Sequence, residues 1–190
     1  MQAFPRTAIA AALAFCAFGA TAGEIADSGF FVNGAVNSSV GLNSKALQQI
    51  GVAEHSGKMR NTAVIVNGAN NTSLGVSTTA RQNIAHVKNN GEIARTAIVA
   101  QGVSNVAAGA FSTAEQDIGF AYGNGKVTDT FVGATGMANT AGGLKATALQ
   151  QVGGASGNGV LRNSHVLATG GVNSAAGILS TAEQRVGVAR

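Results

Sequence analysis

The side chains that most often carry catalysis are few and scattered in this sequence. The three histidines, His55, His86 and His165, have no repeat-related partner, and we expect each to face outward from a strand or a connecting arc. The eight Asp and Glu residues are dispersed, and no acidic loop suggests a Ca²⁺ site. The sequence therefore predicts no catalytic residue, no metal site and no cofactor, and a protein that is not an enzyme.

Other sites for chemistry are equally weak. Residues 123–126 read Gly-Asn-Gly-Lys, but the first glycine of a phosphate-binding loop is missing. The only cysteine, Cys16, lies in an apolar N-terminal stretch, so the rest of the chain has no thiolate metal site, Cys nucleophile or disulfide. The formal charge is only +4 and the basic residues do not cluster. This charge argues against nucleic acid as a partner.

Amide side chains, in contrast, recur at a constant spacing. Two series, one of glutamines and one of asparagines, have their members at positions i and i+34: Gln48, Gln82, Gln116, Gln150, Gln184 and Asn37, Asn71, Asn105, Asn139, Asn173. An amide offers both hydrogen-bond donors and an acceptor, so stacked copies can bond to one another and remain satisfied when buried. We expect both series to form structural ladders.

The same i to i+34 shift aligns the chain from Val32 to Arg190 without insertion or deletion. Such a period is typical of a repeat architecture. We predict a repeat domain over 32–190, preceded by a short segment, 23–31, and a leader, 1–22. The five repeat units are 32–65, 66–99, 100–133, 134–167 and 168–190.

Inside a unit the side-chain pattern alternates with every second position. Val40, Leu42, Ala46, Gln48 and Ile50 fall on one face, and the residues between them vary and are often polar. This alternation predicts strands with one inward face, and the recurring glycines indicate bends. Glycine and asparagine are too frequent for helical repeats. We predict an all-β fold, a β-solenoid of stacked cross-β rungs with a 34-residue repeat and a thin interior suited to small residues.

Charge supports this register. If each unit is one rung, residues i and i+34 lie about 4.8 Å from each other in neighbouring strands. Like charges there repel and opposite charges attract. Within the predicted repeat domain, 32–190, all the charged pairs at this spacing are opposite in sign: Glu54/Lys88, Lys58/Glu92, Glu92/Lys126, Arg81/Glu115 and Arg95/Asp129. Coincidence in a weakly charged chain is the alternative interpretation, and the pattern favours parallel, in-register rungs.

Residues 1–22 have the form of a signal peptide. Arg6 precedes the uncharged apolar stretch 7–18, and Ala20-Thr21-Ala22 fits the small-residue cleavage pattern. A buried N-terminal helix and a lipoprotein signal at Cys16 are the alternatives. No later stretch reaches the ~18 apolar residues of a transmembrane helix. We therefore expect the mature chain to leave the cytoplasm and to contain no membrane span.

The repeat resembles those of bacterial functional amyloids. Residues 102–109, followed by Gln116, are similar to the repeat of Fap-type biofilm fibre subunits. The spacing of Ser112 to Gln116 and of Ser180 to Gln184 is similar to the ladders of curlin. The resemblance implies secretion to the bacterial cell surface through outer-membrane export machinery. It also implies cross-β polymerisation in the biofilm matrix, with itself and with a related fibre subunit, as the minor or nucleating component.

Two functions remain open at this point. The first is a self-assembling matrix fibre subunit, favoured because the mature chain lacks proline, which would block strand edges, and because no atypical polar unit caps the repeats. The second is a soluble monomeric β-solenoid that acts as an adhesin or binds a glycan or ice. Ice binding favours a regular outward threonine row, and Thr79, Thr113, Thr147 and Thr181 form one that Lys45 interrupts.

Overall fold

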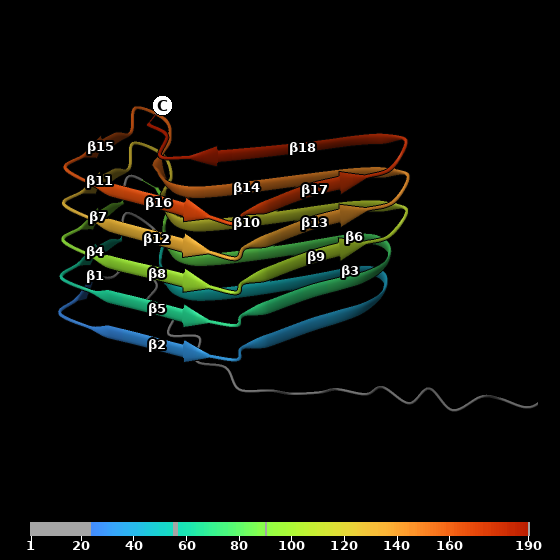
Figure 1. The fold of residues 1–190 in the computed structure, drawn as a ribbon, viewed down its shortest axis with the longest axis horizontal. Helices are drawn as coiled ribbons and strands as arrows, with labels where there is room; N and C mark the ends of the chain where they lie inside the picture. The colour runs from blue at the N-terminus through green and yellow to red at the C-terminus, as the bar shows by residue number, and fades with distance from the viewer. Residues whose placement is uncertain (1–23, 55–56, 90, 190) are drawn as a thin grey trace, which may run out of the picture.

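The computed structural model describes residues 24–54, 57–89 and 91–189, so the predicted leader 1–22 and His55 lie outside the described residues. The described residues form eighteen β-strands and no helix. Strands stack into a column in which each turn of the chain lies on the one before it (Figure 1). No helix in the described ranges is long and apolar enough to cross a membrane.

Each coil contributes one set of strands. The first coil contains β1 (Glu24–Ala26), β2 (Gly29–Asn33) and β3 (Val36–Ala53), and the second contains β4 (Lys58–Arg60), β5 (Ala63–Asn67) and β6 (Asn70–Val87). The third contains β7 (Glu92–Ala94), β8 (Ala97–Gln101), β9 (Ser104–Ala108) and β10 (Phe111–Ala121). The fourth contains β11 (Lys126–Thr128), β12 (Phe131–Thr135), β13 (Ala138–Gly142) and β14 (Lys145–Ala155). The fifth contains β15 (Val160–Arg162), β16 (His165–Thr169), β17 (Val172–Ala176) and β18 (Leu179–Val186).

Three parallel sheets run along the column. One has the order β1-β4-β7-β11-β15, another β16-β12-β8-β5-β2, and the largest β17-β13-β9-β6-β10-β14-β18 with β3 beside β6. Strand partners follow the i, i+34 register, as in the pairs of Gln82 with Gln116 and of Gln116 with Gln150. The predicted all-β solenoid with a 34-residue repeat is therefore confirmed.

The first coil begins earlier than the repeat boundary at residue 32 suggests. Residues 24–31, which we expected to precede the repeat, instead form β1 and most of β2, and Ile25 pairs with Met59 in the common register. The sequence carries a signal for this, because an apolar residue recurs at every equivalent position: Ile25, Met59, Ile93, Val127 and Leu161. A search for residues that are identical in every repeat does not reveal this earlier start, since the apolar residue type changes from coil to coil.

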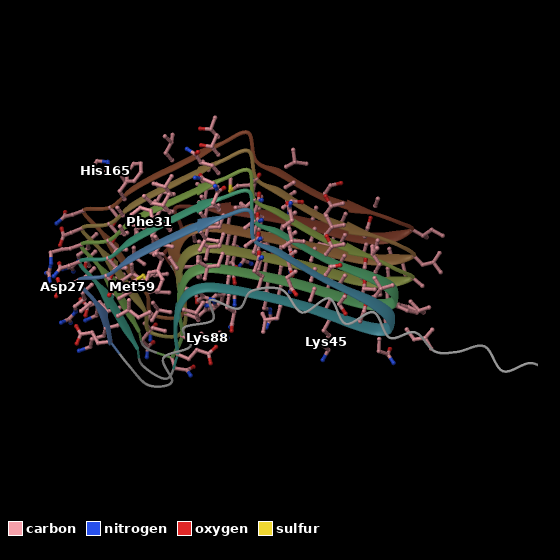
Figure 2. All side chains as sticks on the ribbon, turned by 90° about the horizontal axis from the view of Figure 1, so that it is seen from below. Asp27, Phe31, Lys45, Met59, Lys88 and His165 are labelled. Carbon is pink, nitrogen blue, oxygen red and sulfur yellow. The ribbon has the colours of Figure 1, made fainter. Side chains whose placement is uncertain are left out.

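The interior has a wide part and a narrow limb, seen along the column in Figure 2, where Met59 lies in the wide part and Lys45 on the limb. The wide part holds the larger buried side chains, such as Ile84, Ile118 and Met137. Small hydroxyl residues such as Ser73 and Ser112 are buried in the limb, and its buried apolar residues are all alanines: Ala80, Ala107, Ala114, Ala141, Ala146 and Ala148. Its two β-layers lie close together because methyl groups are the largest apolar groups between them. This accounts for a stable fold with few aromatic residues.

Candidate functional site: two amide ladders

The glutamine series forms a continuous hydrogen-bonded column inside the sheets. Gln82, Gln116 and Gln150 have no exposed surface. The Nε2 of each donates to the Oε1 of the glutamine one coil earlier, at 2.6 Å from Gln82 and at 2.7 Å from both Gln116 and Gln150. Gln184 continues the column by donating to Gln150 at 2.6 Å. The buried amides are thus satisfied by one another along the stack.

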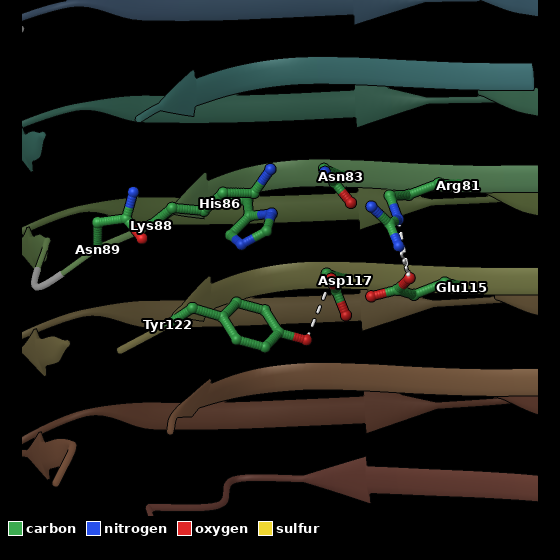
Figure 3. A pocket seen from close by; sticks show the side chains of 8 residues that line it. All are labelled: Arg81, Asn83, His86, Lys88, Asn89, Glu115, Asp117 and Tyr122. Atoms are coloured by element: carbon green, nitrogen blue, oxygen red, sulfur yellow. Dashed lines mark hydrogen bonds and ion pairs between the residues drawn. The ribbon is translucent and has the colours of Figure 1, made fainter. Parts of the chain in front are cut away.

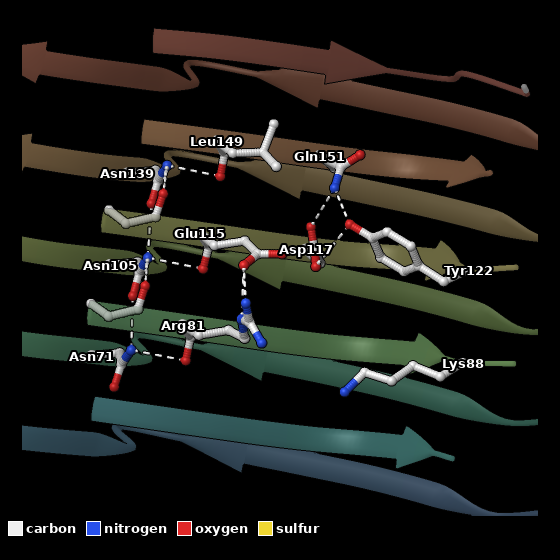
Figure 4. Close-up of polar contacts among 12 residues, drawn as sticks. Asn71, Arg81, Lys88, Asn105, Glu115, Asp117, Tyr122, Asn139, Leu149 and Gln151 are labelled. Atoms are coloured by element: carbon white, nitrogen blue, oxygen red, sulfur yellow. Dashed lines mark hydrogen bonds and ion pairs between the residues drawn. The ribbon is translucent and has the colours of Figure 1, made fainter. Parts of the chain in front are cut away.

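The asparagine series forms a second column, of which Figure 4 shows Asn71, Asn105 and Asn139. Asn71 Nδ2 donates to Asn105 Oδ1, and Asn105 Nδ2 to Asn139 Oδ1, both at 2.8 Å. Asn37 and Asn139 donate in the same way to Asn71 and Asn173. Asn105 Nδ2 also donates to the backbone carbonyls of Ala80, at 3.1 Å, and of Glu115, at 3.0 Å. The inner asparagines, Asn71, Asn105 and Asn139, therefore tie their strands to neighbouring backbone as well as to the next coil.

The two columns have opposite polarity. Glutamine N–H groups point to the preceding coil, whereas asparagine N–H groups point to the following coil. As a result the first coil presents the Oδ1 of Asn37 outside the stack, whereas the Nε2 of Gln48 donates to the backbone carbonyls of Ala35 and Asn70. The last coil presents the Oε1 of Gln184, whereas the Nδ2 of Asn173 donates to the backbone carbonyls of Ala148 and Glu183. The two ends of the described column are therefore chemically different.

Two of the predicted charge pairs form between adjacent coils. Lys88 Nζ lies 3.0 Å from Glu54 Oε1, and Arg81 Nη2 lies 2.5 Å from Glu115 Oε2. The side chains of both pairs are partly exposed, so each pair stabilises the fold by about 1 kcal/mol or less.

At the other charged positions the residues that bond are not the predicted partners, and for Glu92 the reason is a long side chain that reaches sideways from a different position of the neighbouring coil. Glu92 is bound by Arg60 at 2.6 Å, and this hydrogen bond, with added attraction from Lys58 and Lys126, holds the pKa of Glu92 below its usual value. Arg95 donates from Nε to Asn61 Oδ1 at 2.7 Å. The expected ion pair of Arg95 with Asp129 is therefore wrong, although both occupy equivalent bends.

A cavity of about 200 Å³ lies on the outer side of β6 and β10 (Figure 3). Its lining includes His86, which is 2% exposed, so the expectation of an outward-facing side chain is wrong for this residue. His165 is exposed as expected. The position of His86 is occupied by Val52 and Phe120 in the neighbouring coils, and this apolar column was the signal for burial. Among the described residues, no three His, Cys, Asp or Glu side chains are grouped as the ligands of a metal ion would be.

Asp117, which borders this cavity, is the second residue that sequence reasoning missed. Its Oδ1 accepts a hydrogen bond from Gln151 Nε2 at 3.0 Å, and Tyr122 donates to its Oδ2 at 3.4 Å. Burial raises the pKa of Asp117 to about 7 and that of the Tyr122 hydroxyl above its usual value, and it lowers the pKa of His86 to about 3. The cluster is therefore largely uncharged in mildly acidic solution.

We expect the substitution Asp117→Asn to stabilise the protein at pH 8 more than at pH 5. Because the pKa of Asp117 is raised on folding, its protonated form is stabilising at low pH, and this contribution is lost as the pH rises towards 7. Asparagine keeps the shape without ionising, so its advantage should grow by about 2–3 kcal/mol between these pH values. Urea unfolding at both pH values measures this, and the titration of His86 cancels in the difference. Asp129→Asn, at an exposed bend, is the control, and equal pH dependence of Asp117→Asn and wild type would contradict the assignment.

Comparison with known proteins adds no relative. No protein-family model, no curated protein and no solved structure matches the chain.

Proposed function

We propose that this chain is a secreted structural protein that self-assembles into cross-β fibres of the bacterial extracellular matrix, as a minor or nucleating subunit. The supporting observation is the pair of amide ladders, because every coil bonds to the next through the same groups at nearly the same distances. An additional coil would extend both ladders without changing the hydrogen bonds between the existing coils. A stack of this kind has no internal feature that limits its length.

The outer coils supply the surfaces for growth. Within the described residues, the strands of the first and last coils are paired on one side only. Unpaired edges template further strands. Ten of the fifteen exposed large apolar side chains lie on these two coils: Phe31, Val36, Val40, Leu42, Leu47, Leu167, Val172, Ile178, Leu179 and Val186. Stacking would bury much of this surface, which a monomer leaves in water.

The location and partners follow from the leader and from the resemblance to Fap-type subunits. Residues 1–22 would direct export, and outer-membrane machinery would deliver the chain to the cell surface. There it would polymerise with itself and with a related fibre subunit. The role requires no cofactor and no catalysis.

One observation favours a second candidate, a monomeric adhesin or glycan- or ice-binding solenoid. Thr113, Thr147 and Thr181 lie in direct register on the outer face of the limb, next to Thr79. They present a straight row of hydroxyl groups. Lys45 ends the row in the first coil.

Sedimentation separates the two candidates. We expect purified wild-type protein to leave the supernatant on incubation, and a variant with Lys at all five ladder glutamines to stay soluble because charges cannot stack there. Wild type that remains a monomer would favour the adhesin. Assembly of the Lys variant at the wild-type rate would remove the ladders as the basis of the proposal.

A further inference from the structure

The two end coils of the column are complementary to each other and not to themselves. The first coil offers an acceptor at Asn37, and the last offers an acceptor at Gln184. The facing donors, Gln48 Nε2 and Asn173 Nδ2, bond to backbone carbonyls of their own chain, as Asn105 Nδ2 also does while it donates to the next coil. We propose that copies join head to tail, the first coil of one chain on the last coil of another, with the register of the repeat continuing across the junction. This inference rests on the proposed function and adds the polarity and the contact residues.

The proposed junction would bring two opposite charges together, Arg162 of one copy and Glu24 of the next. Within the chain, Arg60 reaches from the second coil to Glu92 of the third at 2.6 Å. Arg162 occupies the position of Arg60 in the last coil, and Glu24 occupies the position of Glu92 in the first. Stacking therefore brings Arg162 to Glu24 of a second copy in the geometry already seen for Arg60 and Glu92. Both junction side chains are exposed in the single chain, where Glu24 also lies 3.7 Å from Arg60 Nη1 in a loose pair that leaves it open to a second arginine.

Apolar residues match in the same register. Continuing the strand register by one coil beyond the last places Phe31 of the second copy over Leu167, and Leu42 over Ile178. All four are exposed large side chains in the single chain. In the same alignment Val36 lies over Val172. No position pairs two like charges, so the junction repeats the composition of the contacts inside the column.

Gly41 is the position at which an added methyl group would meet the junction but no atom of its own chain, although its φ of +158° gives an alanine there some backbone strain. A Cβ atom at the equivalent Gly75, Gly143 or Gly177 would lie 1.6 to 1.7 Å from the carbonyl oxygen of the glycine one coil earlier. A Cβ atom at Gly41 would meet nothing within 4 Å. In the proposed junction the carbonyl of Gly177 from a second copy occupies that space. The substitution Gly41→Ala therefore blocks the first-coil face alone.

The last-coil face can be blocked independently through Ala182. Leu179 N–H donates to Leu144 O and Gly187 N–H to Val152 O, both within the chain. Neighbouring residues of a parallel strand donate to opposite sides, so the N–H of Ala182 faces the open edge. Ala182→Pro removes that donor and adds a ring at the edge while every hydrogen bond to β14 is kept.

The test uses the full chain in three forms, the wild type, Gly41→Ala and Ala182→Pro, followed by analytical ultracentrifugation. Each variant alone should stay folded and monomeric, Ala182→Pro with a thermal unfolding curve close to that of the wild type and Gly41→Ala with a somewhat lower midpoint because of its backbone strain. An equimolar mixture should form a dimer with one copy of each variant, because one open face of each kind remains. Gly142→Ala is the matched control and should assemble, because its Cβ atom meets nothing within 4 Å.

Each other result decides against the junction. If wild type assembles and Gly41→Ala or Ala182→Pro assembles equally well, this interface is wrong while the proposed function stands. If the variants stay monomeric but their mixture does too, the head-to-tail polarity is wrong. If wild type itself does not assemble, the junction and the proposed function fail together.

Discussion

Replacing Gly143 by alanine is expected to lower the free energy of unfolding by about 3 kcal/mol or more. The new Cβ atom would lie 1.6 Å from the carbonyl oxygen of Gly109 and 2.7 Å from its carbon. Both are backbone atoms of the coil below, and they cannot rotate away as a side chain would. The coils must separate at the tip of the limb, where hydrogen bonds such as Gly109 N–H to Gly142 O join them.

The adjacent glycine provides the control for this substitution. A Cβ atom at Gly142 meets nothing within 4 Å, so Gly142→Ala should change stability by less than about 1 kcal/mol. Urea unfolding followed by circular dichroism compares the two variants. If both unfold at the same urea concentration, close stacking is not the reason that glycine recurs at Gly41, Gly75, Gly109, Gly143 and Gly177.

The second large effect is expected from Gln116→Lys in the buried ladder. This position has no exposed surface, and the substitution removes the hydrogen bonds to Gln82 Oε1 and from Gln150 Nε2. It also buries an ammonium group without a counter-charge. We expect a loss of about 3–5 kcal/mol, the magnitude for an uncompensated buried charge.

Gln184→Lys is the matched control because it changes the same residue type in an exposed coil with only one ladder bond. Its lysine can reach water, so the expected loss is about 1 kcal/mol. Urea denaturation of both variants measures the difference. Similar stabilities would show that the ladder glutamines do not depend on burial and stacking.

The sequence predicts the register well because the repeat has no insertions. Once Gln82 and Gln116 occupy equivalent positions in matching patterns, a parallel ladder satisfies both amides when they are buried. The small interior follows in the same way from the alanine columns. The register and the small interior both arise from residues that recur in every repeat, and such recurrence can be detected in a single sequence.

Features found in a single coil could not be predicted in this way. His86 and Asp117 each replace a different residue type in the neighbouring coils, so no column marks them as a cluster. The outline of the coil depends on bends with positive φ, and at Ala85 and Arg95 these fall on residues with no turn preference. The diagonal pair of Arg60 with Glu92 depends on side-chain length rather than on strand register.

X-ray diffraction from aligned wild-type fibres tests the central claim most directly. The described part of a single copy forms five coils and so spans only about 24 Å along the stack at the usual strand spacing. Head-to-tail growth predicts a sharp meridional reflection at about 4.7–4.8 Å, with a coherence length far beyond one copy. A solution that stays monomeric after prolonged incubation, or fibres that lack this reflection on the meridian, would contradict the account.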